Sequence, residues 1–490
     1  MEKKVIIVNK QVYQYPKEIP FRPSKSYPEL INSDLSSSDN DVYDMVREGF
    51  YLSGYDIEHY GMEDWNPLSV LINPGNKVLL KPNLVMEENH IKDNGTDCLY
   101  TQPAVVAAVL DYVILALKGK GSIVVGDAPM QECDFDKLIS DSGYADMISF
   151  YKEKLLFTDI SIDLVDFRGL ISRRINGVNH SVEVQTKGRV IDLGKDSSFA
   201  GKPNAYYDKI RITNYDPAYL RQHHNETTNE YFINEHILQA DVVINMPKPK
   251  THRKAGVTIS LKNLVGINCR KEYLPHHANG SIAEGGDEYE NKNCLKTVVD
   301  CLNDKRNYLS QTAKLYKISW CVLKLAVLLE KISRLIGKDK YYEGSWHGND
   351  TISRTIVDLN KILFYADKSG VMQESKQRKY LIVADMIISG EKEGPVAPTA
   401  KNVGIIAMGE DPVCFDEAIL TLMGAKRDCI HTLDRAREYH KKYKLTEKES
   451  IPIIISNNDK WNEKKIEDID VSTLLYFYPT LGWEKAFLIR

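Results

Sequence analysis

Short apolar runs rich in valine, isoleucine and leucine alternate with helical patterns along most of the chain. Residues 77–85, KVLLKPNLV, have the composition of a buried strand with a polar end, and SIVVGDAP at 122–129 repeats that pattern. Between them, residues 102–121 have helical periodicity and close with glycine. This order predicts a βαβ unit with two parallel strands.

Strand patterns continue at 160–167 and 239–247 and return in the last third of the chain. Residues 378–396 are expected to form a strand that runs into a glycine-rich polar loop. Residues 403–424 are expected to form a strand, a turn and a helix, which Asp411 or Asp416 begins. The predicted fold is therefore α/β, a largely parallel sheet flanked by helices, and such sheets bind ligands at the carboxyl ends of their strands.

Two segments depart from this pattern. Residues 168–215 consist of short alternating runs broken by glycine, asparagine and aspartate, which predicts antiparallel β-hairpins inserted into the sheet domain. Residues 312–338 carry apolar side chains at helical spacing, with Lys317, Lys324 and Lys331 recurring at every seventh position. This predicts a basic amphipathic helix, because the charges are too frequent for a membrane-spanning one.

The amphipathic helix leaves two alternatives open. It either packs on its own protein or a sister subunit, or it lies on a membrane surface to which anionic lipid attracts it. With this helix the chain divides into five predicted parts: a first α/β lobe at 1–167, a β-rich insertion at 168–235, a region of polar loops at 236–310, the amphipathic helix at 311–340 and a C-terminal α/β lobe at 341–490.

The charge balance narrows the choice of partners. Lys and Arg number 64 against 68 for Asp and Glu among 490 residues, so no nucleic-acid partner is expected and any anion site must be local. The first residues, MEKKVIIVNK, fit a strand better than a secretory signal. A cytoplasmic location is expected, with membrane association through 312–338 as the alternative, and an oligomer is left open.

Several cofactor motifs are missing from the sequence. None of the eight cysteines has CxxC spacing, so no iron–sulfur cluster or zinc ribbon is expected, and the cysteines are expected to be reduced thiols. GxGxxG, GxxxxGK[ST] and GxSxG are absent too. Neither a dinucleotide oxidoreductase nor a P-loop kinase is supported.

Polar residues gather where the predicted strands end. Lys81 and Asn83 flank a proline at the end of one strand, and Asp127 follows another. The stretch INMPKPKTH at 244–252 ends a third strand, and its prolines stiffen the segment and pre-order the residues that follow. A buried strand tolerates few polar groups, so these tips must reach solvent or a partner.

The third strand end is rich in cations. Lys248, Lys250 and Lys262 provide ammonium groups for a phosphate or carboxylate, and Thr251 and Asn263 provide donors that would orient it. A solvated turn is the alternative for each strand end taken alone. The pattern therefore predicts an anion site, with its residues drawn from several strands.

Two further stretches are ambiguous. VTISLKNLVG at 257–266 fits either a strand or a helix, and a helix would add N-terminal backbone donors to the anion site. Histidines form a second candidate group, in which one could transfer protons or several could bind a divalent metal together with carboxylates. Their spacing matches no standard metal signature. The candidates are His252, His276, His277 and His347, with Glu272, Asp287, Glu288 and Asp350 as acidic neighbours in sequence.

Taken together, these motifs resemble the family known as domain of unknown function number 362. The matching pieces are VLLKPNLV, IVVGDAP, ADVVINMPKPKTH with VTISLKNLVGI, ISGEKEGPVAP and EDPVCFDEAILTLMG, which follow the family's order across most of residues 76–426. Many members also carry a cysteine-rich, ferredoxin-like iron–sulfur segment, which this chain lacks. WHGND at 346–350 and the amphipathic helix resemble features of a subgroup associated with bacterial surface-polysaccharide gene clusters.

The leading hypothesis is a cytoplasmic enzyme of unassigned reaction that acts on an anionic, phosphorylated or carboxylated metabolite. The predicted catalytic residues are His252, Lys250 and Asp127, with His252 first for proton transfer. The predicted substrate-binding residues are Lys81, Asn83, Lys248, Thr251, Lys262, Asn263, His347 and Glu393. One alternative is a non-catalytic anion-binding or assembly factor that docks on a membrane or protein partner; another is a metal or redox enzyme, so a divalent metal stays open as a cofactor.

Overall fold

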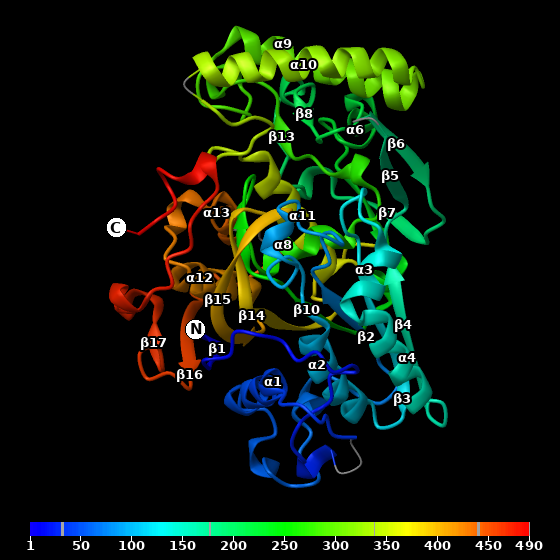
Figure 1. Ribbon diagram of the computed structural model, residues 1–490, viewed down its shortest axis with the longest axis vertical. Coiled ribbons are helices and arrows are strands. Elements are labelled where there is room, and N and C mark those ends of the chain that lie inside the picture. The colour runs from blue at the N-terminus through cyan, green and yellow to red at the C-terminus, as the bar shows by residue number, and fades with distance from the viewer. Residues whose placement is uncertain (31–33, 176–177, 338, 439–441, 490) are drawn as a thin grey trace.

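One large sheet runs through the molecule in the computed structural model (Figure 1). The structure describes residues 1–30, 34–175, 178–337, 339–438 and 442–489. Within them, the sheet follows the order β17-β16-β1-β15-β14-β10-β2-β3-β4, and β11 and β12 attach beside β14. Its strands are β1 (Glu2–Asn9), β2 (Lys77–Pro82), β3 (Lys120–Asp127), β4 (Asp159–Asp166), β10 (Val242–Met246), β11 (Lys250–His252), β12 (Gly256–Thr258), β14 (Lys379–Glu393), β15 (Ala397–Gly409), β16 (Ile451–Ser456) and β17 (Lys464–Lys465).

The half of the sheet that carries the predicted site is parallel. Strands β14, β10, β2, β3 and β4 pair in parallel, as do β1 and β16. Antiparallel pairing is confined to β15 with its two neighbours, to β16 with β17 and to β11 with β12. The prediction of an α/β fold with a largely parallel sheet is confirmed, and β2, β3 and β10 end at the same edge.

Each central strand is buried on both faces. Val78 and Leu80 of β2 pack into one core with the helices α1 (Asp41–Leu52), α2 (Pro103–Leu117) and α4 (Tyr144–Lys154). Leu79 faces a second core with α11 (Thr351–Tyr365), α12 (Pro412–Leu422) and α13 (His431–Arg437). Successive side chains of a strand point to opposite faces, so a strand covered on both sides is apolar at most positions. This explains why the strands appear in the sequence as continuous apolar runs.

The polar loop expected toward the end of 378–396 is mostly part of a long hairpin. Strand β14 continues to Glu393 and pairs antiparallel with β15, from Ile382 opposite Gly409 to Glu393 opposite Ala397. Only residues 394–396 form the turn between the two strands. The helix after β15 begins as expected, because the Asp411 carboxylate accepts hydrogen bonds from the backbone N–H groups of Val413 and Cys414.

Short antiparallel pairs lie outside the main sheet. They are β5 (Leu170–Ile175) with β6 (Val178–Glu183), β7 (Gly188–Asp192) with β9 (Glu230–Asn234), and β8 (Ile210–Arg211) with β13 (His277–Ala278). The pair of β5 and β6 falls within 168–215, where inserted hairpins were predicted, whereas β7 pairs with a strand beyond that range. The five-part division of the chain stays a prediction.

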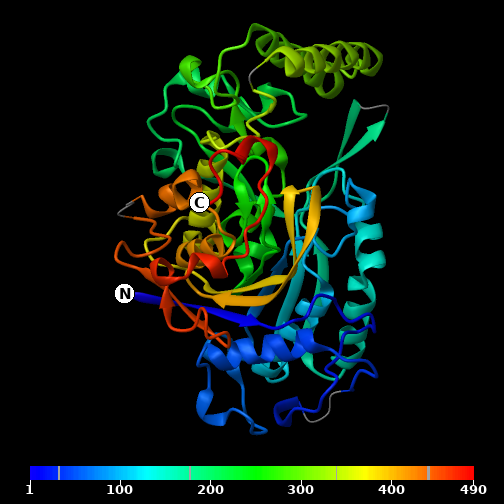
Figure 2. The ribbon, with the colours of Figure 1, turned by 60° about the vertical axis from the view of Figure 1, so that its left-hand side comes forward.

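Helices cover the sheet and also form a separate layer at one end of the molecule. In Figures 1 and 2 the long helix α10 and its neighbour α9 lie side by side across that end, away from α1, α2 and α4. The helices are α1 (Asp41–Leu52), α2 (Pro103–Leu117), α3 (Phe135–Ser142), α4 (Tyr144–Lys154), α5 (Asn204–Tyr207), α6 (Pro217–His223), α7 (Glu235–Gln239), α8 (Ser260–Asn263), α9 (Cys294–Asn307), α10 (Tyr316–Ile336), α11 (Thr351–Tyr365), α12 (Pro412–Leu422) and α13 (His431–Arg437).

Candidate functional site

The carboxyl ends of β2 and β3 are joined by a buried ion pair. The Lys81 ammonium donates to the Asp127 carboxylate at 2.6 Å and also to the carbonyl of Pro82 and the side-chain oxygen of Asn263. Asp127 accepts further hydrogen bonds from the backbone of Leu84 and Ala128. Each charge is therefore well satisfied, as a buried pair requires.

A glycine makes room for this ion pair. A Cβ atom on Gly266 would lie 1.9 Å from an Asp127 carboxylate oxygen and 2.8 Å from the Lys81 nitrogen. No side chain could occupy that position without moving the pair. The glycine of the NLVG stretch is thus explained by close packing of the backbone against two charged groups.

An amide network ties the short helix α8 to the strand ends. Asn263 donates from its side chain to the side-chain oxygen of Asn245 at 2.7 Å, and Asn245 donates to the carbonyl of Ser260 and the hydroxyl of Tyr380. The ambiguous 257–266 stretch proves to be both structures, with strand β12 leading into α8. The network fixes Asn263 in place.

The expected backbone donors at the start of α8 are already used. The Asp416 carboxylate accepts from the backbone of Ser260 at 2.8 Å, from its hydroxyl at 2.5 Å and from the backbone of Leu261 at 3.1 Å. The prediction that this helix N-terminus adds donors to the anion site is therefore wrong. Burial raises the pKa of Asp416 to about 7, and its hydrogen bonds from Ser260 and Leu261 oppose that shift.

A cavity of about 490 Å³ lies at this edge of the sheet. Asn83, Asp127 and Asn263 line it from the strand ends and α8, and further walls come from β11, β12, the loop at 212–215 and the helices α9 and α10. Six basic side chains line it against four acidic ones. The basic residues are Lys250, Arg253, Lys254, Lys262, Lys271 and Arg306; the acidic residues are Asp127, Glu132, Glu330 and Glu343.

Burial makes several of these lysines easy to deprotonate. Burial, followed by the charge of Lys248, lowers the pKa of Lys250 to about 7. The pKa of Lys254 is also lowered to about 7, chiefly by burial, while Lys262 and Lys271 fall to about 8 for the same main reason. Neighbouring ammonium groups repel one another, which disfavours the charged form of each lysine, and a bound anion would offset that repulsion.

Lys250 and Lys254 are held by neutral oxygens at their tips. The Lys250 ammonium donates to the backbone carbonyl of Leu99. Lys254 donates to the carbonyl of Glu343 and to the hydroxyl of Thr213 at 3.0 Å. None of these three hydrogen bonds goes to a carboxylate, but the nearby Glu343 carboxylate favours the ammonium form of Lys254.

Two histidines in the cavity have opposite hydrogen-bonding roles. The backbone N–H groups of Lys254 and Ala255 both donate to Nδ1 of His252, so the neutral ring carries its hydrogen on Nε2. The Nδ1 of His276 donates to the carbonyl of Leu274 at 2.6 Å, so its Nε2 carries a lone pair. Burial lowers the pKa of both rings well below 6.5.

The lining also contains buried polar atoms that lack partners. Within the described residues, no hydrogen bond reaches the Thr258 hydroxyl, which is 3% exposed, or the Tyr215 hydroxyl, which is 5% exposed. The side-chain oxygens of Asn83, Gln131 and Ser172 are likewise unpaired. Such atoms are rare in native proteins, and each costs about 1–3 kcal/mol. Their concentration in one cavity leaves these atoms able to bond water or a polar ligand there.

Five predicted site residues do not line this cavity: Lys81, which pairs with Asp127, and four residues with contacts elsewhere. The Lys248 ammonium, fully buried, donates to Asp385 at 3.0 Å and to the Tyr15 hydroxyl at 2.6 Å. The Thr251 hydroxyl donates to the carbonyl of Lys392. Exposed Glu393 accepts from the backbone of Leu481. Half-buried His347 packs beside Trp346 and Trp483. These four residues therefore do not line the cavity, although Lys248 lies close enough to Lys250 to lower its pKa. The predicted residues that do line it are Lys250, Asp127, Asn83, His252, Lys262 and Asn263.

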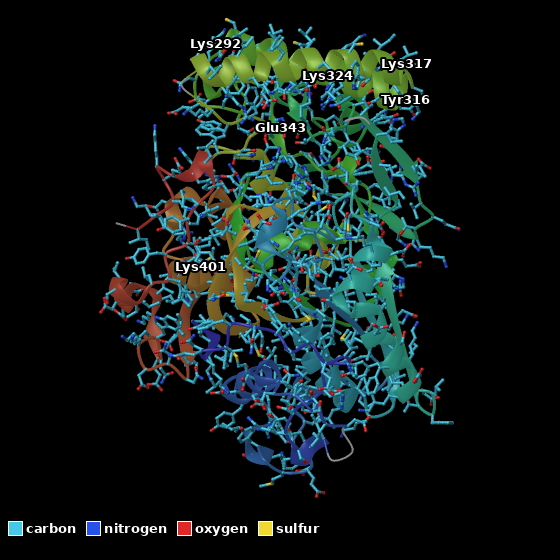
Figure 3. All side chains as sticks on the ribbon, viewed as in Figure 1. Lys292, Tyr316, Lys317, Lys324, Glu343 and Lys401 are labelled. Atoms are coloured by element: carbon cyan, nitrogen blue, oxygen red, sulfur yellow. The ribbon has the colours of Figure 1, made fainter. Side chains whose placement is uncertain are left out.

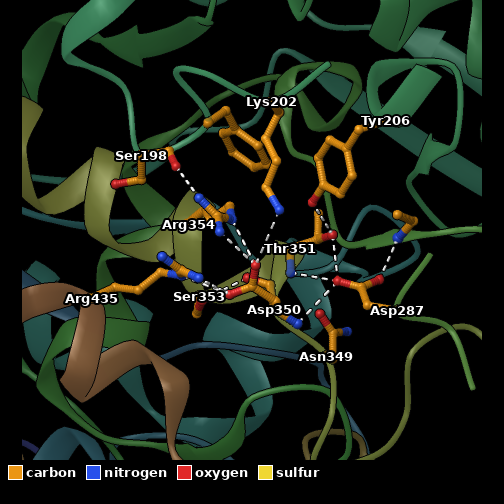
Figure 4. A network of polar contacts seen from close by, with 12 residues as sticks. Ser198, Lys202, Tyr206, Asp287, Asn349, Asp350, Thr351, Ser353, Arg354 and Arg435 are labelled. Carbon is orange, nitrogen blue, oxygen red and sulfur yellow. Dashed lines mark hydrogen bonds and ion pairs between the residues drawn. The ribbon is translucent and has the colours of Figure 1, made fainter. Parts of the chain in front are cut away.

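The WHGND stretch supports the start of α11 rather than the cavity (Figure 4). Asp350 pairs with Arg354 at 2.7 Å and with Arg435 at 2.5 Å. Asp287 caps the helix by accepting from the backbone of Asp350 and from the backbone and hydroxyl of Thr351. The network joins α11 to α13 and to the loop after β13.

Sequence reasoning missed several cavity residues. Lys254 and Arg253 belong to the same basic stretch as Lys250, so their spacing was a usable signal. Lys271 and Tyr215 come from irregular segments that neither periodicity nor a motif marks. Those two residues reach the cavity only through the tertiary fold.

The described residues contain no group of three or more His, Cys, Asp or Glu side chains placed to hold a metal ion. Within the same residues, no helix is long and apolar enough to cross a membrane. The eight cysteines are unpaired, and four of them, Cys98, Cys133, Cys269 and Cys414, are buried.

Fold and cavity define an α/β protein with a cationic ligand cavity at the carboxyl edge of a mostly parallel sheet. The chain belongs to the family described as Domain of unknown function (DUF362), whose profile matches residues 78–169 and 203–421. The interval between the two matched stretches holds β5, β6 and β7. No curated protein and no solved structure matches the chain.

Proposed function

We propose that this protein is an enzyme that acts on an anionic small molecule carrying a phosphate or a carboxylate. The observation that carries the proposal is the cavity, which combines clustered lysines with buried polar atoms that lack partners. A ligand that supplies negative charge and hydrogen bonds would satisfy both. A role in bacterial surface-polysaccharide metabolism remains part of the proposal and rests on the sequence resemblance alone.

In this proposal Lys254, Lys262 and Lys271 hold the anion. Their ammonium groups have no carboxylate partner in a described ion pair, unlike Lys81 and Lys248, whose charges are matched by Asp127 and Asp385. Asn83 and Thr258 would orient the ligand through the side-chain oxygens that the protein leaves unpaired. Lys81 and Lys248, whose charges are already paired, would hold the strand ends in place rather than bind the ligand.

Lys250 is the better candidate for proton transfer. Its pKa of about 7 lets a neutral amine accept a proton near neutral pH. His252 was the first choice from sequence, but its Nδ1 already accepts two backbone hydrogen bonds and its Nε2 carries hydrogen. His252 would therefore donate a hydrogen bond to the anion, and the lone pair of His276 provides a second proton acceptor.

The second candidate function is a non-catalytic anion-binding or docking factor. The helical layer of α9 and α10 favours it, because a docking protein needs an outer surface as well as a ligand cavity. Turnover separates the two: an enzyme consumes its ligand, whereas a binding factor only holds it.

The test begins with thermal unfolding of the purified protein in inorganic phosphate, sugar phosphates, nucleotide sugars and dicarboxylates. A ligand at a hundred times its Kd stabilises the native state by about 2.7 kcal/mol. We expect at least one phosphorylated or carboxylated compound to raise the unfolding temperature, and Lys262→Met to reduce that shift. Consumption of the same compound is then followed by NMR in the wild type and in Lys250→Met.

The matched control is Lys296→Met. Lys296 is also buried, with its pKa lowered to about 8 by burial, but it donates to the carbonyl of Tyr341 and does not line the cavity. It should leave ligand shifts and turnover unchanged. If no anion stabilises the wild type, the anion-site proposal fails. If an anion binds but is never consumed, the second candidate replaces the enzyme.

A further inference from the structure

Helix α10 presents much of its apolar surface to solvent. The side chains that pack it onto the protein are Ser319, Leu323, Ala326 and Ser333. Another side of α10 carries an exposed apolar stripe, which includes Ile318, Leu325, Ile332 and Ile336 of the stripe predicted from sequence. Leu328 and Leu335, which were not predicted, extend it, and Leu335 is 85% exposed. These positions recur at helical spacing, so they form one continuous stripe along α10.

Basic residues flank this stripe. Helix α10 carries Lys317, Lys324, Lys331 and Arg334 against a single acidic residue, Glu330, which pairs with Arg334 at 2.5 Å. All three lysines are exposed. Figure 3 shows Lys317 and Lys324 along one half of the helix.

Aromatic and sulfur groups extend the same surface. Trp320 is 41% exposed, and the Lys324 ammonium lies 5.2 Å from the centre of its ring. Val298 of α9 and Tyr308, which directly follows α9, are also exposed. Three cysteines are exposed within the described residues, and all three lie in this layer: Cys294, Cys301 and Cys321.

We propose that the outer face of α9 and α10 docks on the surface of a membrane that contains anionic lipid. The exposed stripe would enter the interface between headgroups and acyl chains, while the flanking lysines reach lipid phosphates. An interfacial helix combines these features: leucine and tryptophan on one face, lysine beside them and too few apolar residues to span the bilayer.

Charge complementarity favours a membrane over a second copy of this chain. A copy would bring the same lysines to the interface, where like charges facing one another cost several kcal/mol. Anionic lipid instead attracts each lysine. The proposal does not depend on the cavity ligand, so it stands or falls separately from the proposed function.

The experiment is co-flotation of the full chain with vesicles of phosphatidylcholine alone or with 30% phosphatidylglycerol. We expect binding to the anionic vesicles that weakens as salt is raised. Replacing Lys317, Lys324 and Lys331 with Glu should lower the partition coefficient by at least about a hundredfold, because each lysine near an anionic surface contributes about a factor of five and each glutamate adds repulsion. Leu335→Glu should also weaken binding, and it keeps every lysine.

Matched controls carry the same changes elsewhere on the surface. Leu156→Glu makes the same substitution at another exposed leucine, which is 71% exposed and lies in the turn between α4 and β4. Lys92, Lys448 and Lys460 are exposed lysines outside the helical layer, and their triple change to Glu matches the charge removed. Both controls should float as the wild type does, and thermal unfolding checks that every variant is folded.

A reporter on Cys321 gives an independent reading. In a chain with Cys294→Ser and Cys301→Ser, an environment-sensitive dye on Cys321 should shift to shorter wavelength when anionic vesicles are added. Equal binding by the α10 variants and the wild type would overturn the proposal. So would a wild-type dimer in sedimentation that Leu335→Glu dissociates, because the stripe would then belong to a second copy.

Discussion

At the scale of single residues, burial lowers the pKa of four lysines that line the cavity, and basic side chains outnumber acidic ones there. Lys262 faces the positive charges of Lys81 and Lys271 and the carboxylate of Asp127, which is already paired with Lys81. Its environment disfavours the ammonium form until an anion arrives. Proton binding and anion binding at this residue should therefore be linked.

This linkage gives a prediction with a definite sign. At pH 9 Lys262, with a pKa of about 8, is mostly neutral, and a bound phosphate favours the ammonium form and raises that pKa. Binding should take up protons from the buffer, and affinity should fall toward tenfold per pH unit above pH 8 for each lysine that must be charged. Calorimetry in two buffers of different ionisation enthalpy measures the uptake. Lys262→Met should reduce it, and release of protons would contradict the prediction.

At the scale of elements, the turn that follows α8 can pack against the Lys81–Asp127 pair because Gly266 has no side chain. We expect Gly266→Ala to separate the Lys81–Asp127 pair, because its Cβ atom would overlap a carboxylate oxygen. Breaking a buried pair costs about 3–5 kcal/mol, so the free energy of unfolding should drop by an amount of that order. Chemical denaturation measures it, with Val265→Ala as the neighbouring control. Equal loss in both variants would show that the ion pair is not responsible.

The sequence predicted the individual strands and helices better than the tertiary contacts that they make. The strands β2, β3 and β10 were found because burial on both faces leaves continuous apolar runs, and Lys250, His252 and Lys262 were found because they follow one of them closely. The partner of Lys248 could not be found, since Asp385 lies 137 residues away in sequence. For α10 the period was found but not the packed side, because the helix contacts the protein partly through Ser319 and Ser333.

At the scale of the whole molecule, the cavity gathers residues from position 83 to position 396 of the chain. A ligand bound there would hold the strand ends, β11, β12 and the helical layer together. We expect saturating inorganic phosphate to slow amide hydrogen exchange at 82–86, 250–266 and 303–330 at once. Mass spectrometry of the exchanged peptides measures this. Strand β16 (Ile451–Ser456) is the internal control, and protection confined to one of the three regions would place the ligand elsewhere.

Two sides of helix α10 contribute to different surfaces of the protein. Leu323, Ala326 and Val327 form part of the cavity wall, while Leu328 and Leu335 face outward from the same helix. A contact that shifts this helix on one side also moves its other side. If the proposed membrane contact and the proposed cavity ligand each shift α10, the two share a coupling free energy, and each changes the affinity of the other by the same factor.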